Sequence, residues 1–498
     1  MNTMVNRNEF AKKYDVGVPL DESKLGNDHV VLFYNDPKTF PTTDTAASAA
    51  SAADNVDIAT ENCDTMHIIL TQPNEGGGNG RKQCIAIMGQ YESFHIQKLM
   101  RLPPLQPGSG RAGIGINSTL PLRIVNRGMQ MNGRRSIKPP NVEQTKQHWD
   151  NLIPYLQSID TVLKELKPIL EEVVSHNQHN TIIVLVCNFG QSELLMNFGC
   201  NASAKGLGEL LKNIILFATD EETLELGQFL GITTYYSKEI FELMPKNAAR
   251  AYADKTFKAI MAAKVYCVHL VSQLGYNILY QDVDVIWYKN PLPWFHNTSN
   301  PFYNFDMYYQ DDGNHALYYA PYSANTGFYF IRNNPETQYF FNALLMNSDL
   351  IIATSSHQIA LISLLNEHTS MYGLKVKIWE RNLEEFPGGY TFHYKKDYMK
   401  KLMNNEVHPY IFHMSWTKNK NDKVLFYEQL GEWYLEDTCQ GITKAEIDMT
   451  FVGKKNTGAN IDHCCSTTPF VNCHYKDKPS KIPCTDSEPI DKNGRSFW

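Results

Sequence analysis

The sequence has 498 residues, of which 43% are hydrophobic and 20% are charged, so the chain is long enough to form about three globular units. Its net charge of −7, without long runs of Lys or Arg, argues against nucleic acid as a partner. No apolar stretch reaches the roughly 20 residues that cross a bilayer, and the first residues, MNTMVNRNEFAKKYD, have no apolar core of a signal peptide. A membrane anchor is therefore not visible in this sequence.

The first part of the chain differs in composition from the rest. Residues 1–140 are predicted to be irregular and partly disordered, because segments such as TTDTAASAASAAD and PPLQPGSGRAGIG are low in complexity or rich in turn residues. Residues 141–177 are predicted to form a helical lead-in. Its apolar face has spacings of three and four: Leu152, Leu156, Ile159, Leu163, Leu166, Leu170 and Val173. Pro154 and Pro168 are expected to kink or divide this helix.

Strands and helices alternate from residue 181 onward. TIIVLVCNFG, NIILFATD and ITTYY are predicted strands, and helical segments separate them. A long helix, AYADKTFKAIMAAKVYCVHLVSQLG, then leads to the strand in YNILYQDVDVIW. This order predicts an α/β domain over residues 178–438, with a mostly parallel sheet and helices on both faces. Residues 439–498 form a separate Cys-rich tail.

Two carboxylates follow the last of these strands. Asp282 and Asp284 are one residue apart, so on an extended chain both side chains point the same way. Ligands of such sheets bind beyond the carboxyl ends of the strands. Two carboxylates side by side repel each other, and a hard cation such as Mn²⁺ or Mg²⁺ removes that cost. The pattern indicates a platform for a metal and a diphosphate, and the simpler alternative is a solvated turn.

A second chemistry fits the same residues. In phosphatases of the haloacid-dehalogenase type, an apolar strand ends in Asp-x-Asp-x-Val. Asp282 would then be the phosphorylated nucleophile, Asp284 the acid and base, and Asp311-Asp312 the acidic metal motif. That motif normally opens its domain, whereas three predicted strands precede it here.

Longer segments resemble one family. LGYNILYQDVDVIWYKNPLPWF, SANTGFYFIRNNPET and HPYIFHMSWTKNKNDKVLFYEQLGEWYL are similar, in this order, to blocks of the nucleotide-diphospho-sugar transferase domain of glycosyltransferase family 77. The resemblance covers about residues 178–438. It implies a GT-A type fold, a nucleotide-sugar donor, Mn²⁺ or Mg²⁺, a glycan or glycoprotein acceptor, and retention of the anomeric configuration. Attack from the front face, with the departing phosphate accepting the proton, is the mechanism we expect.

The resemblance also assigns site residues by position. Asp282 and Asp284 become the metal motif, which His413 completes, and four residues are expected to contact the donor: Asp220, Lys255, Asn325 and Gly327. Ordinary structural roles remain open for three of them. His413 lies between Phe412 and Met414 as a core histidine would, and Lys255 would equally be a solvated helix lysine. Gly327 precedes a strand, where a glycine serves tight packing or a turn.

The chain departs from the family at one position. Members commonly carry Asp-Gln at the start of the helix behind the sugar pocket, where this sequence has His357-Gln358. These two residues are assigned to the catalytic site, although a histidine stabilises positive charge poorly unless it is neutral. Candidates for the missing carboxylate are Glu384, Glu385, Asp311 and Asp312. The departure also keeps open a non-catalytic, sugar-binding relative.

The cysteines predict the compartment. Five of the ten lie in the last 60 residues, and this tail has too few apolar residues to offset its ordering entropy. We expect at least two disulfides between Cys439 and Cys484 and a third between Cys63 and Cys84; a zinc site that includes Cys464 and Cys465 is the alternative. Disulfides and three Asn-x-Ser/Thr sequons, at Asn117, Asn201 and Asn297, favour the secretory pathway and the Golgi lumen. The alternative is a cytosolic protein with free thiols.

Overall fold

A computed structural model describes residues 142–472, apart from 243, 251, 301, 314–321, 373, 380–382, 414, 418 and 452–462. It also describes four short strands, β1 (Met66–His67), β2 (Ile87–Met88), β3 (Leu99–Arg101) and β4 (Leu122–Ile124), which pair as β1 with β2 and β3 with β4. The chain has two compact units. One contains Met1–Lys138, His315–Ser323 and Ile362–Lys377, and the other contains Pro139–Asn314, Ala324–Leu361 and Ile378–Trp498. The other calls on residues 1–140 lie outside the described residues.

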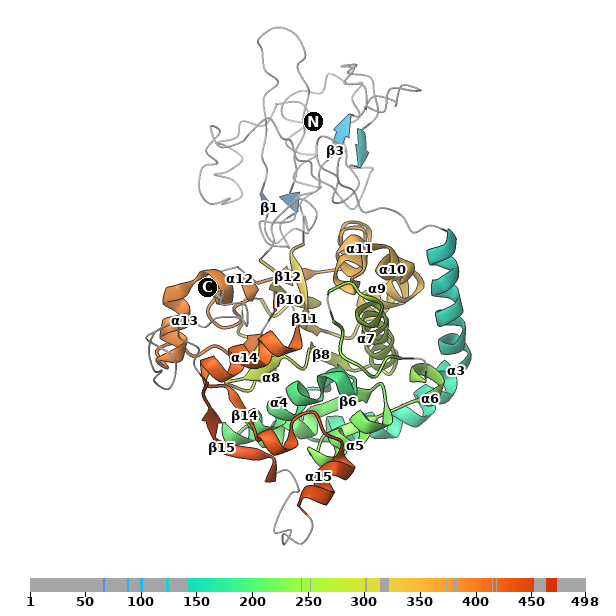
Figure 1. Ribbon diagram of the computed structural model, residues 1–498. Coiled ribbons are helices and arrows are strands. Elements are labelled where there is room, and N and C mark those ends of the chain that lie inside the picture. The colour runs from blue at the N-terminus through green and yellow to red at the C-terminus, as the bar shows by residue number, and fades with distance from the viewer. Residues whose placement is uncertain are drawn as a thin grey trace, which may run out of the picture. The chain divides into compact units, whose positions relative to one another are not determined.

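The main sheet has seven strands in the order β12-β10-β11-β8-β5-β6-β7 (Figure 1). Their bounds are β5 (Thr181–Cys187), β6 (Ile214–Ala218), β7 (Thr233–Tyr235), β8 (Asn277–Gln281), β10 (Met307–Asp311), β11 (Ala324–Ile331) and β12 (Val376–Ile378). β5 is parallel to β6 and β8, and β6 is parallel to β7, whereas β11 runs antiparallel to β8 and β10. The strands β5, β6, β7 and β8 lie where the sequence predicted them, and the α/β fold class is confirmed.

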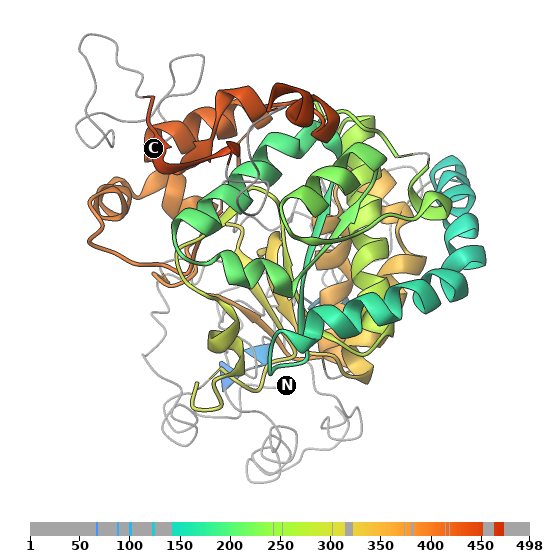
Figure 2. The same ribbon diagram turned by 90° about the horizontal axis from the view of Figure 1, so that it is seen from below.

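Helices pack on both faces of this sheet (Figures 1 and 2). α3 (Val142–Ser175) and α7 (Lys255–Gln273) contact its strands from one side, and α4 (Ser192–Ala204) and α5 (Glu221–Phe229) lie on the other. α3 is a single helix with Pro154 and Pro168 inside it, so of the expected kink or division the division is wrong. Its buried residues also differ from the predicted face: they include Tyr155 and Val162, while Leu156 is exposed.

Further helices complete the described part of the chain. They are η3 (Phe189–Gln191), η4 (Gly208–Asn213), α6 (Lys238–Phe241), α8 (Leu292–His296), α9 (Pro335–Met346), α10 (Asp349–Thr354), α11 (His357–Met371), α12 (Gly389–Tyr394), α13 (Lys396–Met403), α14 (Lys420–Leu430), η5 (Asp437–Cys439) and α15 (Lys444–Thr450). The described helices include none that is both long and apolar enough to cross a membrane. Fully buried aromatic side chains, among them Trp287, Trp379 and Trp433, fill the core of the second unit.

A two-stranded sheet follows the aspartates. β9 (Val285–Trp287) begins at the residue after Asp284 and pairs antiparallel with β13 (Ile411–His413). In this register Val285 lies opposite His413. The pairing is therefore what brings a histidine from late in the chain beside the carboxylates.

Two disulfides fix the tail. Cys439 is bonded to Cys464, and Cys465 is bonded to Cys200 on α4, while β14 (Trp433–Leu435) pairs with β15 (Cys465–Phe470). The prediction of disulfides is confirmed for the tail, with one correction: Cys465 reaches back to α4 instead of pairing within the tail. Because both sulfurs are oxidised, a zinc site at Cys464 and Cys465 is excluded. The expected partners Cys63, Cys84 and Cys484 lie outside the described residues.

Candidate metal centre

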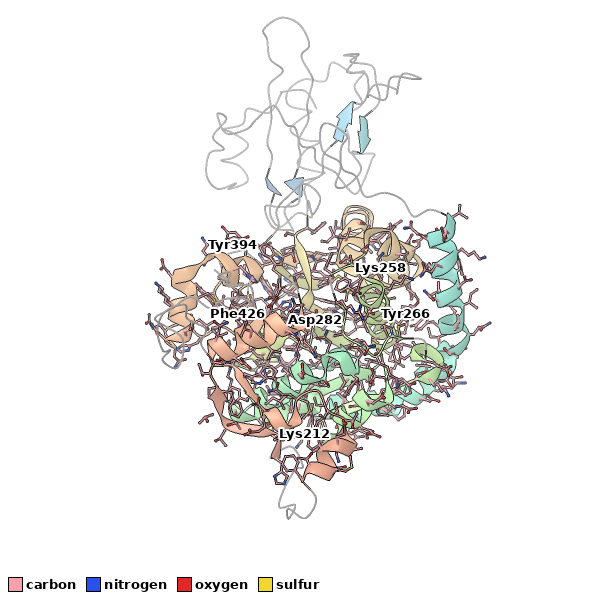
Figure 3. All side chains as sticks on the ribbon, viewed as in Figure 1. Lys212, Lys258, Tyr266, Asp282, Tyr394 and Phe426 are labelled. Atoms are coloured by element: carbon pink, nitrogen blue, oxygen red, sulfur yellow. A yellow bond between two sulfur atoms is a disulfide. The ribbon has the colours of Figure 1, made fainter. Side chains whose placement is uncertain are left out.

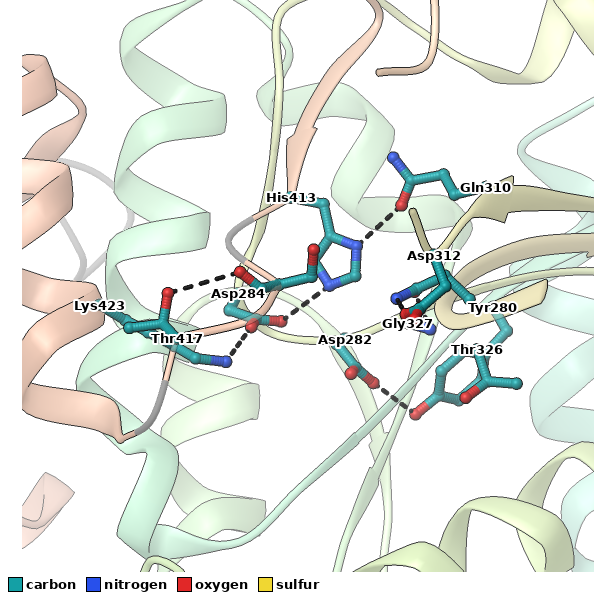
Figure 4. Close-up of polar contacts among 12 residues, drawn as sticks. Tyr280, Asp282, Asp284, Gln310, Asp312, Thr326, Gly327, His413, Thr417 and Lys423 are labelled. Carbon is teal, nitrogen blue, oxygen red and sulfur yellow. Dashed lines mark hydrogen bonds and ion pairs between the residues drawn. The ribbon is translucent and has the colours of Figure 1, made fainter. Parts of the chain in front are cut away.

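The structure brings the predicted metal ligands together. Asp282 follows β8, where its backbone N–H donates to Gly327 O at 2.7 Å, and Asp284 directly precedes β9. One ligand atom from each of Asp282, Asp284 and His413 lies within 4.8 Å of the other two (Figure 4). Asp284 and His413 are buried, and the Asp282 side chain is 24% exposed. The centre thus opens on the side of Asp282.

Hydrogen bonds fix the tautomer of His413. Gln310 Nε2 donates to Pro387 O at 2.7 Å, so its amide oxygen faces His413 Nδ1, 2.8 Å away. Nδ1 therefore carries the proton and donates it to Gln310, which leaves the lone pair of Nε2 facing Asp284 Oδ1 at 3.7 Å. Burial lowers the pKa of His413 further, although Asp284 opposes this shift. The histidine is neutral, as a metal ligand must be.

The protonation state of Asp284 also suits a metal ligand. Burial alone would raise its pKa, but the charge of Lys423 holds the pKa of Asp284 below its usual value. Its Oδ1 is buried and has no hydrogen-bond partner among the described residues. A carboxylate oxygen and an imidazole nitrogen face each other, and no proton lies between them. Together with Asp282 they form the oxygen and nitrogen donor set that suits Mn²⁺ or Mg²⁺, so the residues present fit such an ion.

Two lysines balance the charge of the aspartates. Lys264 Nζ lies 2.5 Å from Asp282 Oδ1, and Tyr280 donates its hydroxyl to the same oxygen at 2.9 Å. Lys423, on α14, forms an ion pair with Asp284 Oδ2. Sequence reasoning missed both lysines. Lys264 did carry a signal, because it is the lone charge in the apolar stretch 259–268 of α7, but Lys423 is one of several lysines in a polar segment.

Gly327 is required by the close approach of His413. A Cβ at this position would lie 2.3 Å from His413 Cε1, 2.6 Å from His413 Nε2 and 3.1 Å from Asn325 Oδ1. Asn325 Oδ1 in turn accepts from Gly327 N at 2.8 Å. The packing role considered for Gly327 is thus present, and both residues lie directly against the metal centre; their contact with a donor sugar stays a prediction.

A carboxylate lies beyond Asn325. Asn325 Nδ2 donates to Asp312 Oδ1 at 2.9 Å, and the side chains of Gln358 and Trp416 also hydrogen-bond Asp312. Burial raises the pKa of Asp312, while these hydrogen bonds act against the shift. Gln358 Oε1 also accepts from Thr326 N at 3.2 Å. Of the four candidates for the missing carboxylate, Asp312 contacts the predicted site residues Asn325 and Gln358, whereas Glu384 and Glu385 are exposed.

His357 lies at the start of α11 and is buried. Its Nδ1 is 2.8 Å from Met261 Sδ, and its Nε2 has no hydrogen-bond partner within the described part of the chain. Burial, and then the charge of Lys264, lower the pKa of His357 far below its usual value. His357 is therefore neutral, and the same lysine that pairs with Asp282 influences it.

The last two predicted donor ligands have other surroundings. Asp220 is the N-cap of α5: its Oδ1 accepts from Thr223 N at 2.8 Å, and its Oδ2 accepts from Phe189 N at 2.9 Å. These bonds hold the turn after β5 against the end of β6. Lys255 is exposed at the first position of α7, nine residues before Lys264. Donor contacts of Asp220 and Lys255 stay predictions.

Comparisons with known proteins agree with this geometry. Residues 209–426 match the family model described as nucleotide-diphospho-sugar transferase. A relative from Dictyostelium discoideum, UDP-galactose:fucoside alpha-3-galactosyltransferase, is 24% identical over 314 residues, which cover 54% of this chain and 45% of the relative. Beta-arabinofuranosyltransferase RAY1 from Arabidopsis thaliana is 26% identical over 178 residues, which cover 35% of this chain and 30% of that protein.

The matched segments thus span less than half the length of either relative. The family expected from the motifs is nevertheless confirmed for the matched range, which contains Asp282, Asp284 and His413. Residues 209–426 of this chain form a domain of the nucleotide-diphospho-sugar transferase family.

Proposed function

We propose that the chain is a metal-dependent, retaining glycosyltransferase that moves a sugar from a nucleoside-diphosphate donor to a glycan. One observation supports metal dependence above all: Asp284 Oδ1 and His413 Nε2 face each other with lone pairs only, and Asp282 lies within reach of both. The family match and the sugar transferases among the relatives support the reaction class and favour it over the phosphatase alternative.

Different residues of the metal centre would have different roles in the transfer. Asp282, Asp284 and His413 would hold Mn²⁺ or Mg²⁺, and the bound ion would neutralise the charge that develops on the departing diphosphate. Lys264 and Lys423 pair with the carboxylates in this structure, and phosphate oxygens offer both ammonium groups an alternative partner. Tyr280 holds Asp282 in place from β8.

The donor sugar would extend from the metal centre toward Asn325, Asp312 and Gln358. These side chains are linked to one another by hydrogen bonds, and Asn325 also adjoins Gly327 and His413. Asp312 supplies a carboxylate near the position where family members carry aspartate and this chain carries His357. A buried carboxylate with fixed donors around it selects among sugar hydroxyls, because a hydroxyl in the wrong place leaves polar groups unpaired.

Turnover of nucleotide-sugars tests the proposal. A panel of uridine and guanosine diphosphate sugars is incubated with the protein and Mn²⁺, and release of the nucleoside diphosphate is measured with and without simple glycosides. At least one donor should be hydrolysed, and Asp284→Asn should lower the rate by more than a hundredfold. Asp349→Asn is the control, because Asp349 lies on α10 and accepts from Thr145 instead. Donor binding without turnover would show a non-catalytic relative, and release of phosphate from p-nitrophenyl phosphate without any sugar acceptor would point to the phosphatase.

We also propose that the protein works in an oxidising lumen of the secretory pathway. The disulfides Cys200–Cys465 and Cys439–Cys464 support this location, because such bonds are rare in reducing compartments. The sequons differ in access: Asn201 is fully buried and its Nδ2 donates to Glu432, whereas Asn297 is exposed. Asn297 is therefore the sequon we expect to carry a glycan. A shift in mass after N-glycosidase treatment, absent in Asn297→Gln, checks this; unmodified Asn297 together with free thiols throughout would contradict the location.

A further inference from the structure

Four aromatic side chains form a cluster around Trp416, which follows the metal ligand His413 by three residues in the sequence. This Trp416 cluster consists of Tyr390, His393, Tyr394 and Trp416. The Trp416 ring stacks on His393 at a centroid distance of 6.1 Å and meets Tyr394 edge-on at 6.0 Å. Trp416 is 40% exposed and Tyr394 is 63% exposed, whereas the largest aromatic side chains of the core are fully buried. In Figure 3, Tyr394 lies at the margin of the unit and Asp282 lies near its centre.

The backbone holds Trp416 in an unfavourable conformation. Its φ of 62° is in the left-handed region, which bulky residues rarely adopt. His393 Nε2 hydrogen-bonds Ser415 O at 2.8 Å and fixes the turn, and the ring lies against Gly313, where a Cβ would come within 3.0 Å of Trp416 Cζ2. Strain of this kind persists only where surrounding structure imposes it, and it concentrates at ligand sites. The fold thus presents a large apolar ring to solvent at a defined place.

Hydrogen bonds connect this ring to the proposed sugar site. The Trp416 side chain bonds Asp312, Asp312 accepts from Asn325, and Asn325 adjoins Gly327 and His413. The exposed Trp416 ring therefore lies next to the buried polar residues around the metal centre. Ser415 Oγ is buried beside it and has no hydrogen-bond partner among the residues that the structure describes.

The order of the strands places the Trp416 cluster away from the expected nucleotide site. β8 carries Asp282 at its end, with β5, β6 and β7 on one side and β11 and β10 on the other. Nucleotides bind at the carboxyl ends of the parallel strands, which here are β5, β6, β7 and β8. Asp312 follows β10, so the Trp416 cluster adjoins the other side of the metal centre. A ligand on the cluster would face the donor sugar and not the base.

We infer that the Trp416 cluster is the acceptor subsite and that its ligand is a sugar ring stacked on Trp416. This inference rests on the proposed function and adds the place at which the acceptor sugar binds. The C–H face of a pyranose is apolar and its rim is polar, which matches an amphipathic indole beside the Asp312 carboxylate. In the transfer, the acceptor oxygen bonds to the anomeric carbon and the bond from that carbon to the diphosphate breaks. The diphosphate keeps the electron pair and takes up the hydroxyl proton.

Four variants test the subsite: Trp416→Ala, Trp416→Phe, Tyr394→Ala and the control Trp149→Ala. Trp149 is 43% exposed on α3, so Trp149→Ala removes a similarly exposed indole ring outside the Trp416 cluster. The probes are methyl α-L-fucoside, methyl β-D-galactoside and methyl β-D-xyloside, together with a serine-containing peptide. Binding is measured by saturation-transfer NMR with Mn²⁺ and nucleoside diphosphate present, and transfer is measured with the donor that the panel identifies.

Trp416→Ala should raise the glycoside KM at least tenfold and abolish the NMR signal of the glycoside ring. Nucleoside-diphosphate affinity should stay within about twofold of wild type. Trp416→Phe should recover most of the acceptor affinity, Tyr394→Ala should show a smaller loss, and Trp149→Ala none. Glycoside KM and nucleoside-diphosphate affinity together distinguish the subsite from a merely structural role, which would reduce the affinity for nucleoside diphosphate as well.

Three results would overturn the inference. One is a glycoside KM unchanged in Trp416→Ala, and another is a matching loss of nucleoside-diphosphate affinity, which would make the ring a base platform. The third is wild-type protein that binds none of the glycosides, or that transfers sugar to the peptide alone. Failure of the proposed function looks different, because wild-type protein would then hydrolyse no nucleotide-sugar, while the NMR experiment still decides whether glycosides bind at Trp416.

Discussion

Gln310 accepts a hydrogen bond from His413 across 103 residues of sequence, with 2.8 Å between Nδ1 and Oε1. The bond fixes which nitrogen of His413 carries the proton, and thereby aims the lone pair of Nε2 at Asp284. Partners of this kind, one step outside the ligands, commonly set metal affinity. Gln310 itself is oriented by Pro387 O, so a loop far from the aspartates also contributes to the centre.

The first prediction concerns this partner. Gln310→Leu should weaken Mn²⁺ binding by roughly 10-fold to 100-fold, because His413 would lose its fixed tautomer and ring orientation. Isothermal titration with Mn²⁺, in the presence of nucleoside diphosphate, measures the effect. Gln429→Leu is the control, since Gln429 is equally buried but lies on α14 and donates to Leu425 O. Equal Mn²⁺ affinity in the two variants would mean that Gln310 only supports the fold.

The second prediction concerns Lys423. In Lys423→Gln the buried Asp284 carboxylate loses its ion-pair partner, and we expect the metal-free protein to lose about 3 kcal/mol of unfolding free energy. Mn²⁺ should then raise the melting temperature more than it does in wild type, because the ion replaces the missing charge. The advantage of nucleoside diphosphate over monophosphate in binding should also shrink.

Lys420→Gln provides the matched control for Lys423. Lys420 lies three residues earlier on α14 and pairs with Glu193 at 2.6 Å. Removing it should leave the response to Mn²⁺ unchanged. If both variants respond to Mn²⁺ as wild type does, the Lys423–Asp284 pair has no part in the metal centre.

The sequence located the carboxylates of the site because they follow an apolar strand at a spacing of two, a local pattern that survives in the fold. It could not locate their partners. Gln310 and Lys423 lie 103 and 139 residues from the side chains they contact, and only the pairing of β9 with β13 and the packing of α14 bring them there. Such contacts leave no periodic mark in a single sequence.

Two other expectations show the same limit. Two prolines predicted a kink or a division of α3, but one helix continues through both, and its buried residues lie along one face. Tertiary packing therefore overrode the signal for a division. Cysteine spacing indicated disulfides in the tail, yet it could not reveal that Cys465 pairs with Cys200, 265 residues away. Cysteine content therefore predicted disulfides in the tail, and the fold determined which cysteines pair.

The third prediction concerns acid stability. Burial, followed by the nearby His179 and Arg332, lowers the pKa of His296 to about 4. The unfolded chain binds a proton at about pH 6.5, so the folded state is favoured above that pH and loses this stabilisation as the pH falls from 6.5 toward 4. The melting temperature should fall over this range, and less steeply in His296→Gln, whose amide retains a donor for Thr181 Oγ1. Parallel pH profiles for the two proteins would contradict the assignment.

The fourth prediction compares the two disulfides, which serve as controls for each other. Cys200–Cys465 closes a separation of 265 residues and Cys439–Cys464 one of 25. If disulfides act mainly by restricting the unfolded chain, the longer loop should contribute about 2 kcal/mol more to the free energy of unfolding. Denaturant titrations of Cys200→Ala/Cys465→Ala and of Cys439→Ala/Cys464→Ala measure the two losses. The first variant should lose more stability but keep donor hydrolysis, because neither cysteine contacts Asp282, Asp284 or His413. Equal losses would mean that native packing of β15 against α4, and not chain entropy, governs the contribution of the longer link.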